Sequence, residues 1–219
     1  SIVGDLTLTT GTGGSSGGLT QSGALTVGGA SSFYADTKTN QDASLSSQDN
    51  KFTGAVSFGP ANGGSWKNIE LKDTDGGILL GGSAIGGNLS LQSTDGAITQ
   101  SAGTALNIDG TTTLTASDGA GTPTDYAITL SNGTNDFGSE LRVIRASDVR
   151  LVDTDALTLH DVTASGDLLV TAGGDLSAVD GSSSGTDSLQ AAGNILLEST
   201  GGALDLEIDV TSTGGDITF

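Results

Sequence analysis

The chain repeats the same succession of short sequence blocks at an offset of about 80 residues. GDLTL at Gly4–Leu8 returns as GNLSL at Gly87–Leu91, and IELKDTDGGILL at Ile69–Leu80 returns as VRLVDTDALTL at Val149–Leu159. A third copy begins with GDLLV at Gly166–Val170. Repetition of this kind is typical of solenoids, in which each unit buries its apolar face against the next unit.

We therefore divide the chain into repeats 1–82 and 83–161 and a partial, diverged third repeat, 162–219, which together form a single solenoid segment. Strand-like residues stand at both ends, 2–8 and 216–219, without a polar or helical cap. Uncapped strand edges pair with other strands. We expect a segment of a longer chain, whose partners are copies of itself placed end to end or the flanking solenoid of the same polypeptide.

Apolar residues alternate with polar ones throughout, as in Leu89/Leu91 and Leu106/Ile108. This period of two predicts half-buried strands, and the runs are bounded by Gly, Asp, Asn and Ser, which favour turns. No stretch has the period of a helix. A β-sandwich needs no repeat, and propeller blades carry more aromatic residues than the 4% found here. The pattern predicts an all-β chain folded as a parallel β-helix (β-solenoid), with about 20 residues per coil.

Three segments depart from this pattern and are expected to be loop-outs: 30–49, 59–68 and 111–134. They contain the aromatic residues Tyr34, Trp66 and Tyr126. Because aromatic rings on loops can stack on sugars, these three residues are the candidate ligand-binding side chains, with surface glycans as the ligand. For Trp66 we favour a ring that folds back over the rod.

The net charge of −19 comes from 26 acidic and 7 basic residues. Such a surface repels phosphate backbones and anionic lipid, so we expect no nucleic-acid partner. The sequence has no apolar run of about 18 residues, so we expect no membrane insertion. The chain has no cysteine, which excludes disulfides and thiolate chemistry.

Two pairs of aspartates, Asp73/Asp75 and Asp153/Asp155, are the candidate metal-binding residues, since carboxylates two positions apart can converge on Ca²⁺. Both pairs fill the same slot of the repeat, which favours a turn role over catalysis. The single histidine, His160, is expected to be exposed at a strand end. We expect no catalytic residue, no enzyme activity and no cofactor other than calcium.

The blocks NDFGSELRV (residues 135–143) and GGNLSLQSTDGAITQSAGTALNIDG (86–110) resemble repeats of large bacterial surface proteins related to filamentous haemagglutinins. The resemblance covers most of residues 50–175. It implies a right-handed β-helix, an extracellular location on the bacterial surface, and an adhesive or filament-forming role.

Together these features predict a structural protein, either the shaft of an adhesin or a self-associating surface filament. The alternatives are a carbohydrate-active β-helix enzyme and the glycan-binding tip of an adhesin.

Overall fold

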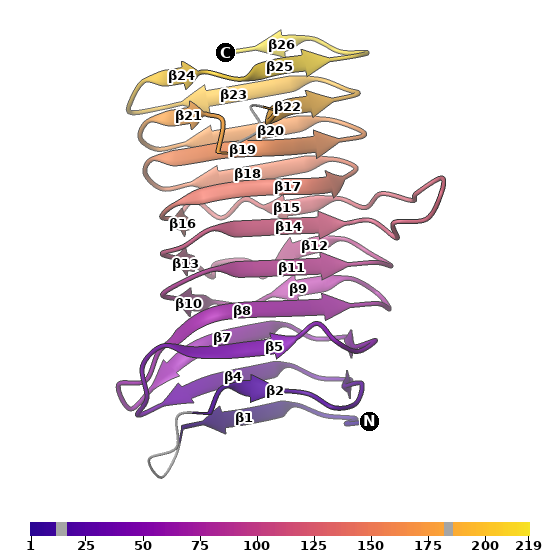
Figure 1. The fold of residues 1–219 in the computed structure, drawn as a ribbon, viewed down its shortest axis with the longest axis vertical. Coiled ribbons are helices and arrows are strands. Elements are labelled where there is room, and N and C mark those ends of the chain that lie inside the picture. The colour runs from indigo at the N-terminus through magenta and orange to yellow at the C-terminus, as the bar shows by residue number, and fades with distance from the viewer. Residues whose placement is uncertain (12–16, 182–185) are drawn as a thin grey trace.

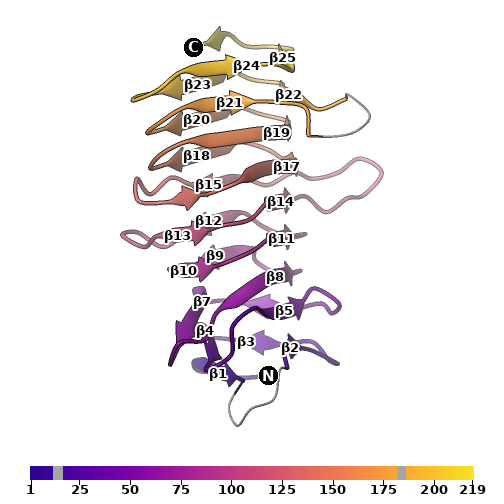
Figure 2. The same ribbon diagram turned by 60° about the vertical axis from the view of Figure 1, so that its left-hand side comes forward.

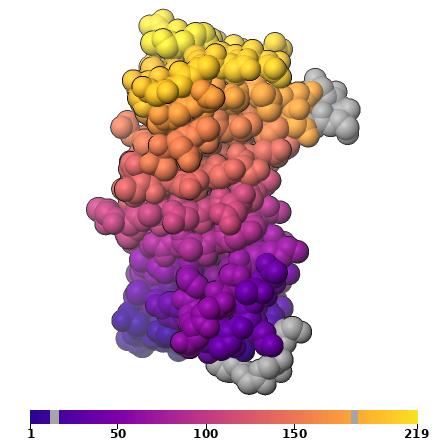
Figure 3. Space-filling view, turned by 90° about the vertical axis from the view of Figure 1, so that its left-hand side faces the viewer, coloured from indigo at the N-terminus to yellow at the C-terminus, as the bar shows by residue number. Residues whose placement is uncertain are grey.

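The computed structural model describes residues 1–11, 17–181 and 186–219. In this part of the chain every regular element is a strand, and the strands stack in parallel as a β-solenoid of about 8 turns (Figure 1). The turns follow the chain from one end of the body to the other (Figure 3). The prediction of an all-β parallel β-helix is therefore confirmed. The described residues contain no helix that could cross a membrane.

Two large sheets and one small sheet form the walls. The first large sheet consists, in spatial order, of β1 (Leu6–Thr10), β4 (Ser31–Asp36), β7 (Val56–Ala61), β9 (Ile78–Leu80), β12 (Ile98–Gln100), β15 (Ile128–Leu130), β18 (Val149–Asp153), β20 (Leu168–Ala172), β23 (Ile195–Ser199) and β26 (Ile217–Thr218). The second consists of β2 (Leu19–Thr20), β5 (Gln41–Leu45), β8 (Trp66–Asp73), β10 (Ser83–Ile85), β11 (Leu89–Ser93), β13 (Leu106–Ile108), β14 (Thr112–Ala116), β16 (Asp136–Phe137), β17 (Glu140–Ala146), β19 (Leu157–Ala164), β21 (Leu176–Ala178), β22 (Ser188–Ala191), β24 (Leu204–Leu206) and β25 (Asp209–Ser212). The small sheet pairs β3 (Thr26–Val27) with β6 (Lys51–Phe52).

A regular turn contributes three strands. β9, β10 and β11 follow one another along the chain, and each pairs with the strand one turn later, β12, β13 and β14 (Figure 2). The first strand of each set lies in the first large sheet and the other two lie in the second. The second sheet therefore covers two sides of the core.

The turns are somewhat longer than the coil length expected from the sequence, with a spacing of about 24 residues per turn. Their lengths also vary. The step from Val149 to its partner Leu168 is short, whereas the step from Ile98 to its partner Ile128 is long because it includes the segment 117–127. The expected coil length is thus close to that of the tighter turns, and insertions at the corners lengthen the others.

The core is a continuous column of aliphatic side chains along the axis. In β11, Leu89 and Leu91 are buried while Ser90 and Gln92 are exposed, and Leu91 stacks on Leu71 and Leu114 of the neighbouring turns. Burying each leucine stabilises the fold by about 2 kcal/mol. Near the N-terminal end the column becomes aromatic, with Phe33 and Phe58 stacked at a centroid distance of 5.2 Å.

Side-chain amides link successive corners. Oδ1 of Asn68 accepts a hydrogen bond from the Asn88 N–H at 3.1 Å, and Oδ1 of Asn88 accepts one from the Thr111 N–H at 2.9 Å. Each Asn thereby satisfies a backbone donor of the next turn, where the chain bends out of the strand ladder. This explains the recurring Gly-Asn or Gly-Asp at strand starts.

The predicted loop-outs are only partly present. Segment 30–49 is not a loop-out, because it contains β4 and β5. Segment 59–68 is not one either, since β7 and β8 leave only residues 62–65 between them. In segment 111–134, residues 117–127 do project from the rod after β14 (Figure 1). The polar and aromatic residues of segment 30–49 made it resemble a loop in the sequence, although its inward positions in β4 and β5 are buried as in the other strands.

Candidate functional site

The two aspartate pairs hold the backbone in the same way in both repeats. Oδ2 of Asp73 accepts a hydrogen bond from the Phe52 N–H at 2.6 Å, and its Oδ1 accepts one from the Asp75 N–H at 2.9 Å. Asp153 receives the same bonds from Phe137 at 2.7 Å and Asp155 at 2.8 Å. Both inner carboxylates are buried and bridge adjacent turns.

Burial raises the pKa of Asp73 above its usual value, against the hydrogen bonds that the backbone donates to it. For Asp153 burial and the neighbouring Asp155 raise the pKa to about 6. The outer residue Asp75 instead pairs with Lys51, with Nζ and Oδ2 2.8 Å apart. Among the described residues, no three His, Asp or Glu side chains come together in a group that could hold a metal ion.

A buried asparagine next to each aspartate joins neighbouring turns. Nδ2 of Asn135 donates to Oε1 of Gln100 at 3.0 Å and to the Leu130 carbonyl at 3.3 Å. Its Oδ1 accepts hydrogen bonds from the Leu106 N–H at 3.1 Å and from Nε2 of Gln100 at 2.6 Å.

In the first repeat Asn50 and Gln21 make the equivalent amide pair, and Asn50 also donates to the Leu45 and Lys72 carbonyls. We call these two clusters the amide hubs. They account for the repeated Gln and Asn of the sequence blocks, and sequence reasoning did not identify their contact.

Trp66 cannot stack on a ligand, because only 1% of it is exposed. Its Nε1 donates to the Phe33 carbonyl at 3.2 Å, and its ring meets Phe58 edge to face at 6.1 Å. The prediction of Trp66 as a ligand-binding side chain on a loop is therefore wrong. Trp66 is the first residue of β8, and its ring points into the core. The buried indole finds a partner for its N–H, as such groups usually do.

The two tyrosines lie far apart in the fold. Tyr34 is 36% exposed on β4. Tyr126 closes the projecting loop 117–127, and its hydroxyl donates to Oδ1 of Asp95 at 3.3 Å. At the same loop, Nε of Arg145 donates to Oδ1 of Asp125 at 2.7 Å, so this arginine holds the loop to β17.

His160 is buried, not exposed at a strand end as expected. The pairing of β17 with β19 shifts register between Leu141 and Val143, so two residues, His160 and Asp161, face Arg142 alone. This β-bulge turns His160 away from the regular alternation. The break of alternation between Leu159 and Val162 was the sequence signal for it.

Charged groups surround the buried imidazole. Nδ1 of His160 lies 3.4 Å from Oδ2 of Asp187, and Nε2 lies 3.3 Å from Oε1 of Glu140. Asp187 also lies 3.6 Å from Nη2 of Arg142 and accepts the Gly181 N–H at 2.9 Å. Although burial opposes ionisation, the hydrogen bond from Gly181, the charge of Arg142 and the neighbouring His160 side chain hold the pKa of Asp187 below its usual value. The cluster ties the start of β22 to β17 and β19.

Comparisons with known proteins give one family. A model of a family described as repeats of unknown function, DUF5649, matches three successive segments, residues 1–59, 67–143 and 146–211. Neither the curated proteins nor the solved structures contain a match to the chain. Since the three segments cover most of the sequence, the chain belongs to the DUF5649 repeat family.

Proposed function

We propose that this chain is a structural rod element, either the shaft of a bacterial adhesin or a unit of a self-associating surface filament. The observation that carries the proposal is the ladder of parallel strands along the whole body with one apolar column inside it. Each turn adds strand spacing of about 4.8 Å, so about 8 turns give a rod of about 40 Å.

The two end faces support pairing with further coils. In the first large sheet β1 and β26 are the two edge strands, and among the described strands each has a neighbour on one side only. Apolar side chains lie exposed at both ends, Val3 at one and Ile217 and Phe219 at the other. We propose that these faces pair with parallel strands of a second copy or of flanking solenoid in the same polypeptide.

Negative-stain electron microscopy of the purified chain over a range of concentrations tests this proposal. Rods that lengthen by head-to-tail addition as the concentration rises support self-association. Single short rods at every concentration favour the other proposed partner of the end faces, the flanking solenoid of the same polypeptide. Compact particles without an elongated axis would reject the structural role.

We further propose that the repeats are of the filamentous haemagglutinin-like kind and lie outside the cell. The acidic surface and the resemblance of the repeat blocks support this location. Protease treatment of intact cells of the source organism tests it, with release of peptides from this chain as the expected result. Peptides that appear only after cell lysis would overturn the extracellular location.

The proposed role is not enzymatic. Both carboxylate oxygens of the inner aspartates Asp73 and Asp153 accept hydrogen bonds from backbone N–H groups, which favours a structural role in the turns over the carbohydrate-active alternative. Incubation with a panel of plant and bacterial polysaccharides, followed by a reducing-end assay, tests this directly. Release of reducing ends from any of these polysaccharides would establish the alternative.

A further inference from the structure

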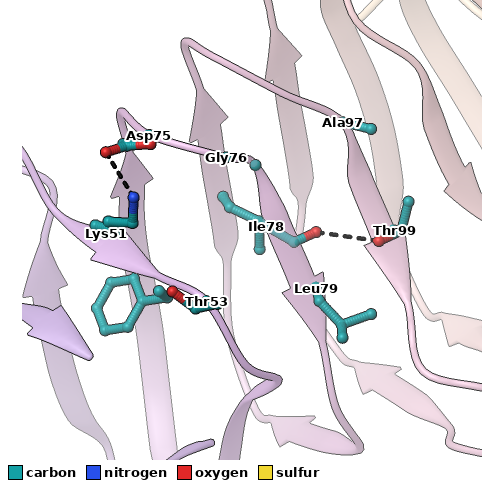
Figure 4. Close-up of a pocket in the computed structure, with 10 residues that line it drawn as sticks. Lys51, Thr53, Asp75, Gly76, Ile78, Leu79, Ala97 and Thr99 are labelled. Carbon is teal, nitrogen blue, oxygen red and sulfur yellow. Dashed lines mark hydrogen bonds and ion pairs between the residues drawn. The ribbon is translucent and has the colours of Figure 1, made fainter. Parts of the chain in front are cut away.

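A pocket opens in the wall of the first repeat where two turns diverge. β7 and β9 pair at a single position, Val56 with Leu80, so the chain segments before that pair separate. The space between them has a volume of about 280 Å³. Figure 4 shows Lys51 and Thr53 on one side, the strand carrying Ile78 and Leu79 in the middle, and Thr99 on the next strand.

The lining of this pocket is amphipathic. Its apolar surface comes from the partly exposed side chains of Leu79 and Ala97, and the buried residues Phe52 and Ile78 form its floor. Polar groups stand around this apolar surface. Nζ of Lys51 and Oδ2 of Asp75 are 2.8 Å apart, and both side chains are about half exposed, at 41% and 59%.

Two hydroxyl groups complete the polar lining. The Thr99 hydroxyl donates a long bond, 3.5 Å, to the Ile78 carbonyl, and Thr53 stands exposed on the opposite side of the pocket (Figure 4). An apolar surface with a few placed polar groups is the usual composition of a small-molecule site.

The repeat serves as an internal control for this pocket. The scaffold residues Asn50 and Asp73 recur as Asn135 and Asp153 with the same hydrogen bonds. Lys51, by contrast, is replaced by an aspartate in the second repeat.

The turn beside Asp75 also differs between the repeats. Gly76 and Gly77, at φ 107° and 88°, adopt backbone conformations that other residues rarely take, and the second repeat has a single alanine there. The solenoid folds without the lysine and the two glycines, so its scaffold does not require them.

We propose that this pocket binds one neutral pyranose unit of a glycan. The C–H face of a sugar ring fits against the partly exposed Leu79 and Ala97, while its hydroxyls can donate to Asp75 and accept from Lys51. Neutral sugars are preferred because the chain carries a net charge of −19 and Lys51 is already paired. This inference goes beyond the structural role, since the rod can form whether or not the pocket is occupied.

The test is an NMR titration of the ¹⁵N-labelled chain with methyl glycosides of glucose, galactose, mannose and N-acetylglucosamine. We expect saturable shifts of the amides of Thr53, Gly77, Leu79 and Thr99 with at least one sugar. Lys51→Asp should weaken that binding at least about tenfold, because it removes the donor and places two carboxylates together.

Two further variants complete the test. Lys67→Asp makes the same charge change at an exposed position of β8 outside the pocket, and should leave binding unchanged. The double variant Thr53→Val, Thr99→Val removes the hydroxyls with little change of shape and should weaken binding even if Lys51→Asp fails to fold. The proposal is overturned if no sugar gives saturable shifts, or if the shifts persist in both pocket variants.

Discussion

The amide hub at Asn135 gives the sharpest test of what holds the turns together. Asn135→Ala leaves the buried Leu130 carbonyl and Leu106 N–H without their side-chain partner, and also unpairs Gln100. A buried polar group left unsatisfied costs about 1–3 kcal/mol, so two such backbone groups predict a loss of about 2–6 kcal/mol in the free energy of unfolding. Because a solenoid is stabilised turn by turn, the loss should be local.

Guanidinium denaturation followed by far-UV circular dichroism measures the loss, and hydrogen exchange with mass spectrometry locates it. We expect faster exchange over residues 98–137, the turns that the hub joins. Asn107→Ala is the matched control, since Asn107 is exposed on β13 of one of these turns. If both variants lose the same stability, to within about 0.5 kcal/mol, the hub does not stabilise the fold.

Three other predictions concern charge and packing. Asp136→Lys should raise the free energy of unfolding by less than about 1 kcal/mol and so raise the melting temperature slightly. Burial and Asp155 raise the pKa of Asp136, and a lysine at this position would form the pair that Lys51 makes with Asp75 in the first repeat. An unchanged or lower melting temperature contradicts this. Because the pKa of Asp153 is raised to about 6 in the fold, the folded state binds a proton there more tightly than the unfolded state does. Protonated Asp153 therefore stabilises the fold by at most about 3 kcal/mol; this stabilisation is present below about pH 4 and is lost as the pH rises through 6. Asp153→Asn should remove this pH dependence in denaturant titrations, and an unchanged slope would refute it. Trp66→Ala should cost about 3–5 kcal/mol, and acrylamide should quench the native Trp66 fluorescence poorly; efficient quenching contradicts the burial.

The role of the aspartate pairs could be read from the sequence, whereas the amide hubs could not. Alignment of the repeats placed Asp73 and Asp153 in one slot, which predicted a turn role. Gln21 and Asn50 are repeated too, but they are 29 residues apart, and their contact follows only from the stacking of turns. Whether two residues this far apart in the sequence meet depends on the length of every corner of the solenoid that lies between them in the chain.

The aromatic residues show the limit of composition. Polar neighbours made segments 30–49 and 59–68 resemble loops, yet Phe33 and Trp66 lie in the core of β4 and β8. A strand needs apolar residues only at its inward positions, so a short polar run with one or two rings can still form one.

By itself, the sequence determined that this chain is a stack of parallel strands, because alternation and turn residues act over a few positions and the repeat forces one unit to pack on the next. The tertiary structure decided the length of each turn, the burial of Trp66 and His160, and the pocket beside Lys51. Those features depend on which residues of one turn lie over which residues of the next, and a single bulge or corner insertion changes that register.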